Sequence, residues 1–244
     1  MTFRFRFRGK SNLYGRLLIF VLFIMVTVLL SSESAYLFDH PERGPKIGGA
    51  IVSVLQVGFY LYAMQLMLVL GYTHRALRVV LYGYAVIASI GGLYISNPFL
   101  DVLGNETLRV IYSAFHIVNI NIFLAFGLVI LRDIFQSKET HTDHIWGALV
   151  AYFMLVFAFG DLYELITLQR PGLLGQVYEL GWPNYIQCIM YSMNAVAGID
   201  STYPDAHVLI KKLSVLESIL GNLYLVVILG RLLSHPLKRK ETLT

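Results

Sequence analysis

The sequence has few charged residues. Asp, Glu, Lys and Arg make up 14% of its 244 residues, and 57% of the residues are hydrophobic. Soluble domains carry roughly 25% charged residues, so this composition excludes an ordinary soluble protein and a disordered one. Little of the chain is left over for a soluble catalytic or regulatory domain.

Cysteine is also scarce, and nucleotide-binding motifs are missing. The single cysteine, Cys188, excludes an intramolecular disulfide and a zinc site built from several cysteines of one chain. The sequence contains neither a Walker loop nor a dinucleotide fingerprint. A pair of histidines, His141 and His144, hints at a metal-dependent membrane enzyme, but a solvated loop is the simpler interpretation. We therefore expect no enzyme activity, catalytic residue, metal, cofactor or nucleic-acid partner.

Long apolar runs are what the sequence has instead. A bilayer core about 30 Å thick needs roughly 20 apolar residues per helix, and runs of this length are too long for buried strands. The candidate spans are residues 17–32, 47–71, 79–100, 110–131, 145–168 and 213–230. The sequence predicts an all-α membrane protein with six transmembrane helices.

The first span follows a basic leader and has two interpretations. The leader resembles the start of a signal peptide, and the bond between Ser34 and Ala35 could be its cleavage site. We favour an uncleaved first helix. The remaining spans are the same in either case.

Basic residues predict the orientation. Lys and Arg gather in segment 1–16, in the loops after the second and fourth spans, and in segment 235–244. The opposite loops are poorer in basic residues. The positive-inside rule then places both termini in the cytoplasm, which agrees with six spans. We expect a multi-pass protein of the plasma (inner) membrane, with a four-helix region over residues 17–134.

The stretch between the last two spans has an unusual pattern. After a loop rich in Gly and Pro comes an apolar piece, 184–193, which is too short to span and too apolar for an ordinary external loop. An irregular stretch follows. A short helix that enters a membrane and an irregular segment that leaves it form a re-entrant loop, whose backbone must be buried in protein or line a water-filled cavity. From this pattern alone, an amphipathic loop packed at the membrane surface is an equal alternative.

The residues around this piece follow a recognisable order. The order is Tyr191-Ser192, Val196 to Asp200, Tyr203-Pro204, Leu216-Glu217, Gly221-Asn222-Leu223-Tyr224 and Gly230-Arg231-Leu232. Residues 184–234 thereby resemble the pore module of the tetrameric potassium-channel superfamily, especially its small prokaryotic members. Those proteins read aromatic-Ser, TVGYGD, Tyr-Pro, Leu-Glu and Gly-Gln-Leu-Tyr. The first four spans show no such resemblance, and only their number fits a six-span channel subunit.

The resemblance implies a fold and a function. A pore module over residues 144–234 would comprise an outer helix, a re-entrant pore loop and an inner helix, and would assemble as a homotetramer in the lipid bilayer. The implied ion pathway consists of Val196, Ala197, Gly198, Ile199 and Asp200. Glu164, Glu217 and Tyr203 would support the pore, with Glu217 behind the short helix rather than in the ion path. Gly221 and Gly230 would serve as gating hinges or permit close packing.

The filter segment departs from the family pattern. Val196, Ile199 and Asp200 replace the threonine, the tyrosine and the second glycine, whereas Gly198 is retained. A potassium filter needs carbonyls that all point inward, and the positive φ values this requires are cheap only for glycine. We therefore expect passive passage of a monovalent cation, K⁺ or Na⁺, with weak or altered potassium selectivity. Rings of Asp200 and, further out, Asp205 would concentrate cations.

Polar residues also occur inside the spans. His116 and Asn119 are three residues apart, as are Asp161 and Glu164, so each pair shares a helix face. Such residues are candidates for a functional site. Hydrogen bonding between helices is the simpler interpretation of the first pair. The second pair either bonds behind the filter or is solvated near the membrane surface. The fourth span lacks the regularly spaced arginines of a voltage sensor. We therefore expect no voltage gating by such a helix.

Two other functions fit the same sequence. A non-conducting membrane scaffold or accessory subunit could retain a degenerate pore fold. A small-solute transporter could act as a monomer, although transporters often contain internal repeats and none is visible here.

Overall fold

The computed structural model describes residues 13–37, 43–69, 105–137, 142–178, 180–199 and 203–234, together with part of 79–93. These residues form helices joined by turns and contain no strand. The elements with defined bounds are α1 (Leu13–Leu37), α2 (Arg43–Val69), α4 (Asn105–Gln136), α5 (Thr142–Gln169), α6 (Trp182–Val196) and α7 (Val208–Leu233). The described residues of 82–91 are helical as well.

Four of the described helices are long and apolar enough to cross a membrane. Their apolar spans are Leu13–Leu30, Glu106–Gln136, Thr142–Gln169 and Val208–Leu233. They match the first, fourth, fifth and sixth predicted spans, so the prediction of an all-helical chain with membrane-spanning segments is confirmed at this level. The second predicted span begins inside α2, a 27-residue helix. The third falls on a segment of which only some residues are described, so the count of six stays a prediction.

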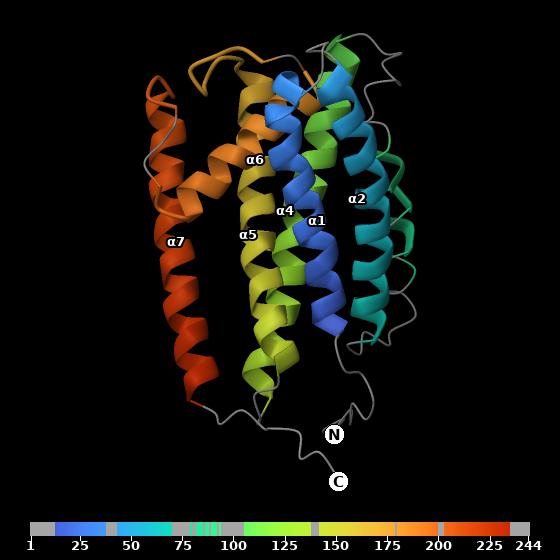
Figure 1. The fold of residues 1–244 in the computed structure, drawn as a ribbon, viewed down its shortest axis with the longest axis vertical. Coiled ribbons are helices and arrows are strands. Elements are labelled where there is room, and N and C mark those ends of the chain that lie inside the picture. The colour runs from blue at the N-terminus through green and yellow to red at the C-terminus, as the bar shows by residue number, and fades with distance from the viewer. Residues whose placement is uncertain are drawn as a thin grey trace.

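The long helices form a bundle with two distinct ends. α1 and α5 begin, and α4 and α7 end, at the lower end in Figure 1. The lower end is held by Asp143, whose Oδ1 accepts hydrogen bonds from the backbone N–H groups of Tyr14 (3.1 Å) and Gly15 (3.3 Å). The Tyr14 hydroxyl donates to Asp133 at 2.8 Å. The two bonds to Asp143 satisfy N–H groups in the first turn of α1, which have no partner inside their own helix.

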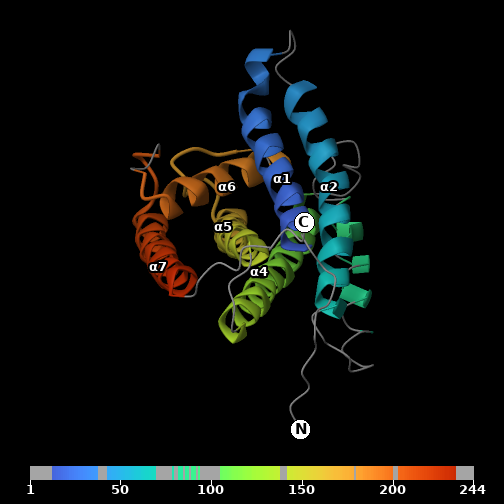
Figure 2. The ribbon, with the colours of Figure 1, turned by 60° about the horizontal axis from the view of Figure 1, so that its bottom comes forward.

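The centre of the bundle is aromatic. The Phe59 ring lies 6.1 Å from the Phe123 ring and 6.4 Å from the Phe126 ring, measured between centroids, and the Phe123 ring lies 5.4 Å from the Phe157 ring. Edge and tilted contacts of this kind add to the stability that burial gives. They join α2, α4 and α5. α7 lies at the edge of the bundle and reaches this core through Ile228, and α6 runs between α5 and α7 (Figures 1 and 2).

α6 has 15 residues and follows a path unlike that of the long helices. It starts at the upper end, where α5 ends, and runs obliquely down to α7 (Figure 1). Its last residue meets the middle of the 26-residue α7, because a Cβ built on Gly221 would lie only 2.6 Å from Val196 Cγ2. The contact lies roughly 20 Å below the start of α7. The chain is back at the upper end by His207, whose N–H donates to the Leu173 carbonyl at 2.8 Å.

Candidate functional site

Local sequence explains where α6 begins and ends. Pro183 lies in the first turn, where its missing N–H costs nothing, and Gly181 precedes the helix with φ 93°. At the other end, Gly198 has φ 68°. Its N–H donates to the Ala195 carbonyl at 3.1 Å, and the Ile199 N–H donates to the Asn194 carbonyl at 2.9 Å. This pair of bonds is a Schellman motif, which favours glycine at the left-handed position.

The predicted ion pathway begins at this helix end. Val196 is buried against α7, and its carbonyl accepts a hydrogen bond from the Tyr152 hydroxyl at 3.3 Å. Ala197, Gly198 and Ile199 are exposed on the surface of the chain. Asp200 lies outside the described residues. The structure therefore places three of the predicted pathway residues at an open surface and turns the Val196 carbonyl toward α5.

A buried hydrogen-bond network lies behind α6, between α5 and α7. Glu217 of α7 has no exposed surface. It accepts a hydrogen bond from the Tyr163 hydroxyl of α5 at 2.7 Å and is bonded to the Ser192 hydroxyl of α6. The Ser192 hydroxyl also lies 2.8 Å from the Val156 carbonyl. Glu217 thus joins α5, α6 and α7 through buried contacts.

The donors around Glu217 are hydroxyl groups. The Ser192 hydroxyl has one hydrogen, and both Glu217 Oε1 and the Val156 carbonyl lie within its reach. No described Lys or Arg pairs with Glu217. Within the described residues, Glu217 is therefore held by neutral hydroxyl donors rather than by an ion pair.

Tyr203 fixes the chain as it returns from α6 toward α7. Its hydroxyl is hydrogen-bonded to Gln187 Oε1, and its ring lies 5.4 Å from the Tyr191 ring. Tyr191 in turn meets Tyr163 edge-on at 5.0 Å. Of the three predicted pore-supporting residues, Glu217 and Tyr203 therefore both hold α6, by independent contacts.

Glu164, the third of these residues, belongs to a different cluster. His116 of α4 lies between two carboxylates of α5. Its Nδ1 is 2.8 Å from Asp161 Oδ1, and its Nε2 is 3.1 Å from Glu164 Oε2. The three side chains are at most 2% exposed, so the expectation that Asp161 and Glu164 are solvated is wrong. The pair faces α4 because α4 and α5 pack along one another.

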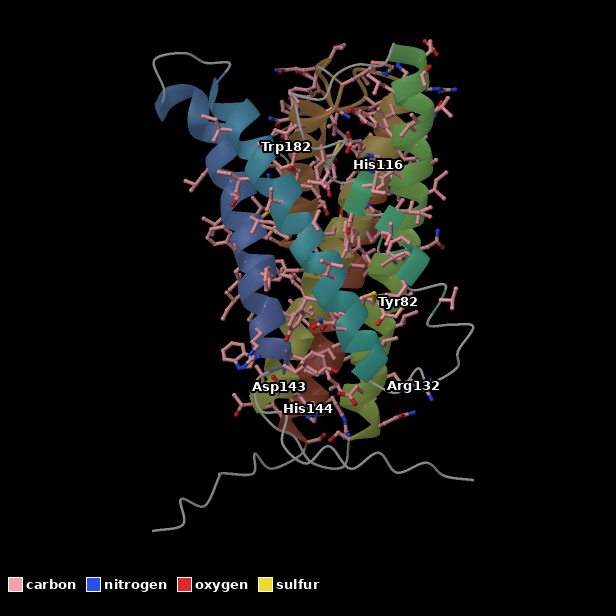
Figure 3. The ribbon with its side chains drawn as sticks, turned by 90° about the vertical axis from the view of Figure 1, so that its right-hand side faces the viewer. Tyr82, His116, Arg132, Asp143, His144 and Trp182 are labelled. Carbon is pink, nitrogen blue, oxygen red and sulfur yellow. The ribbon has the colours of Figure 1, made fainter. Side chains whose placement is uncertain are left out.

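α6 covers this cluster with its own polar residues. The Tyr185 ring lies beside the His116 ring, tilted by 31°, with 5.7 Å between centroids. Asn184 donates to Thr167 Oγ1 at 3.0 Å, and Thr167 contacts Cys188 Sγ at 3.7 Å. Figure 3 places His116 in the same half of the bundle as Trp182, the first residue of α6. The first half of α6 is therefore seated on α4 and α5, and its second half is seated on α5 and α7.

Asn119 extends the polar face of α4 toward α2. Its Oδ1 accepts hydrogen bonds from the hydroxyls of Tyr60 (3.0 Å) and Tyr84 (3.1 Å). The interpretation of His116 and Asn119 as residues that bond between helices is thus confirmed. Asn121, on another face of α4, bonds to the Ile117 carbonyl of its own helix and to no other described residue.

The two predicted hinge glycines have different surroundings. Gly221 touches Val196, as described above. No atom of the described residues lies within 4 Å of a Cβ built on Gly230. Of the two histidines that the sequence pairs, His144 is buried near the lower end (Figure 3). His141 lies outside the described residues. In the part of the chain that the structure covers, no three His, Cys, Asp or Glu side chains are arranged to hold a metal ion.

Sequence reasoning missed the partners of the buried acids. Tyr163 and Tyr185 are not distinguished by the sequence, because tyrosine occurs throughout this apolar chain, and Ser192 is distinguished only as part of the channel-like order. One signal was available, since Tyr163 lies between Asp161 and Glu164 and next to the latter.

Comparison with known protein families, characterised proteins and solved structures finds no match to this chain.

Proposed function

We propose that the chain is the subunit of a tetrameric cation channel whose pore module consists of α5, α6 and α7. The observation that carries this proposal is the path of α6, which descends to the middle of α7, docks at Gly221 and lets the chain return to its starting end. Outer helix, half-depth helix and inner helix are the parts that the sequence resemblance implies. In a membrane this path would be a re-entrant loop, which is stable only where protein or water surrounds its backbone.

The exposure of α7 supports assembly around this helix. Only 17% of its apolar span is buried within the chain, against 61% for α5. Its exposed residues include Val215, Val226 and Leu229, at 54–69% exposure. In the proposed tetramer, four copies of α7 surround the central axis and cover these side chains. Both chain termini are cytoplasmic, and α6 enters from the outer side.

The end of α6 supports cation passage along this axis. Residues 197–199 are exposed beside α7, and Gly198 already has the positive φ that a carbonyl-lined filter requires. Four copies of Asp200 at the mouth concentrate cations by their charge. The replacement of the threonine, the tyrosine and the second glycine weakens the preference for potassium over sodium.

Cation flux into liposomes tests this function, with Asp200→Asn as the informative variant. We expect the purified wild-type chain to pass K⁺ and Na⁺, and Asp200→Asn to reduce the flux severalfold at low ionic strength. The reduction shrinks in concentrated salt, because the Debye length falls from about 10 Å at 0.1 M to about 3 Å at 1 M. Glu106→Gln is the matched control, since Glu106 is a 92% exposed carboxylate on α4, outside the pore module.

The possible outcomes separate the interpretations. Equal flux in Asp200→Asn and wild type rules out the carboxylate ring. A strict preference for potassium means that the filter assignment of residues 196–200 is wrong.

One observation favours a second candidate, a membrane scaffold or accessory subunit that does not conduct. Tyr152 occupies the carbonyl of Val196, the first residue of the predicted pathway. A carbonyl held in this way does not replace the water shell of an ion. A folded tetramer that passes no cation under any condition supports this candidate.

A further inference from the structure

The His116 cluster contains two acidic side chains and only one basic side chain. Nδ1 and Nε2 of the imidazole each face a carboxylate, and both nitrogens donate only when the ring is the imidazolium. A neutral ring donates from one nitrogen, so the carboxyl at the other nitrogen must then carry a proton. In either arrangement the cluster holds one proton more than a neutral imidazole and two carboxylates would hold. Its net charge is therefore −1.

A second proton makes the cluster neutral. Asp161 Oδ2 and Glu164 Oε1 are buried, and neither makes a hydrogen bond of ordinary length and angle with a described residue, so either oxygen can bind it. No Lys or Arg pairs with these acids in the described part of the chain. A buried net charge without a counter-ion is costly, which favours uptake of the second proton.

The neighbours of the cluster provide no compensating charge. Tyr60 of α2 and Tyr84 face Asp161, and Tyr185 and Cys188 of α6 face the two acids. Beside Tyr185, α1 presents the apolar Ile24 and Val28. Glu217 of α7 is bonded to Ser192 and Tyr163 in its own network. None of these neighbours carries a positive charge.

We propose that His116, Asp161 and Glu164 form a proton-binding site that keeps α6 docked on α4 and α5 while it carries its second proton. Loss of this proton leaves a buried negative charge, which the uncharged donors Tyr185 and Asn184 of α6, next to Asp161 and Glu164, do not balance. Water then enters to solvate the charge, and the first half of α6 lifts. This inference does not depend on whether the chain conducts cations.

Cys188 provides a probe for this movement. It is the only cysteine of the chain, lies on α6 and has no exposed surface. The test measures its rate of modification by a thiol reagent in the full-length protein as the pH is raised. Each rate is divided by that of the denatured chain at the same pH, which removes the intrinsic increase in thiolate. We expect the normalised rate to rise roughly tenfold or more from mildly acidic to alkaline pH, as expected for a change of about one pK unit or more in proton affinity.

Two variants make the test specific. Asp161→Asn combined with Glu164→Gln removes both negative charges, so its normalised rate stays low at every pH. Glu217→Gln is the matched control, because it changes a buried acid that touches α6 but does not belong to the His116 cluster. We expect it to retain the pH dependence of the wild type. If the double variant fails to fold, Glu164→Gln alone is expected to show a much smaller rise.

A second readout detects the proton itself. Infrared titration of the Glu217→Gln protein should show a protonated-carboxyl band that disappears as the pH is raised. The band should be absent when Asp161→Asn and Glu164→Gln are added. The proposal is overturned if the band is absent at every pH, or if the double variant shows the same pH-dependent modification of Cys188 as the wild type.

Discussion

Gly221→Ala is expected to destabilise the chain, whereas Gly230→Ala is expected to leave it unchanged or slightly more stable. The new methyl group at position 221 would lie 2.6 Å from Val196 Cγ2 and 3.2 Å from the Val196 carbonyl oxygen. The oxygen belongs to the backbone at the end of α6, so a side-chain rotation cannot relieve this contact. Overpacking of this kind costs about 1–3 kcal/mol.

Gly230 is a matched control on the same helix. Its surroundings are open within the described residues, so alanine there brings only its better helix propensity, about 1 kcal/mol at most. The free energy of unfolding in a mild detergent measures both variants. Equal effects at the two positions would mean that α6 does not dock on α7 at Gly221. Cation flux measured on the same samples tells whether displacement of Val196 also closes the proposed pore.

His116→Leu is expected to have a larger effect, a loss of roughly 3–5 kcal/mol, because it removes the only described ion-pair partner of two buried carboxylates. The loss should be larger at alkaline than at mildly acidic pH, since the two acids can remain buried only if they bind protons.

Asn121→Leu is the control for the loss of a polar side chain from α4. Asn121 is exposed, and its described hydrogen bond stays within its own helix, so the variant should stay within a few tenths of a kcal/mol of the wild type. Thermal and chemical unfolding at several pH values provide the comparison. A small, pH-independent effect of His116→Leu would contradict the assignment of charge to the cluster.

Local features of the fold could be predicted from the sequence. Composition alone indicates helices that span a membrane, and the short apolar piece at 184–193 lies inside α6, whose first turn contains Pro183 and whose end is followed by Gly198. Each of these signals depends on a few neighbouring residues. The structure therefore reproduces the short helix where the pattern placed it.

The buried contacts could not be predicted in the same way. His116 meets Asp161 across 45 residues of sequence, and Glu217 meets Tyr163 across 54. These pairings depend on how α4 and α7 are positioned against α5, and spacing within one helix does not determine that. Glu164 is an example. The sequence correctly placed it on the same helix face as Asp161, but solvent, one of the two environments it allowed for this face, is wrong.

Cross-linking between copies of α7 tests the central claim, assembly around this helix, most directly. In a Cys188→Ser background, Val226→Cys places a single thiol on α7 at a position that is 69% exposed, and Val110→Cys places one on α4 at a position that is 70% exposed. With a flexible bifunctional thiol reagent, the account predicts that Val226→Cys gives covalent species up to four chains and that Val110→Cys stays monomeric. Only monomers from Val226→Cys, or equal cross-linking at both positions, would contradict it.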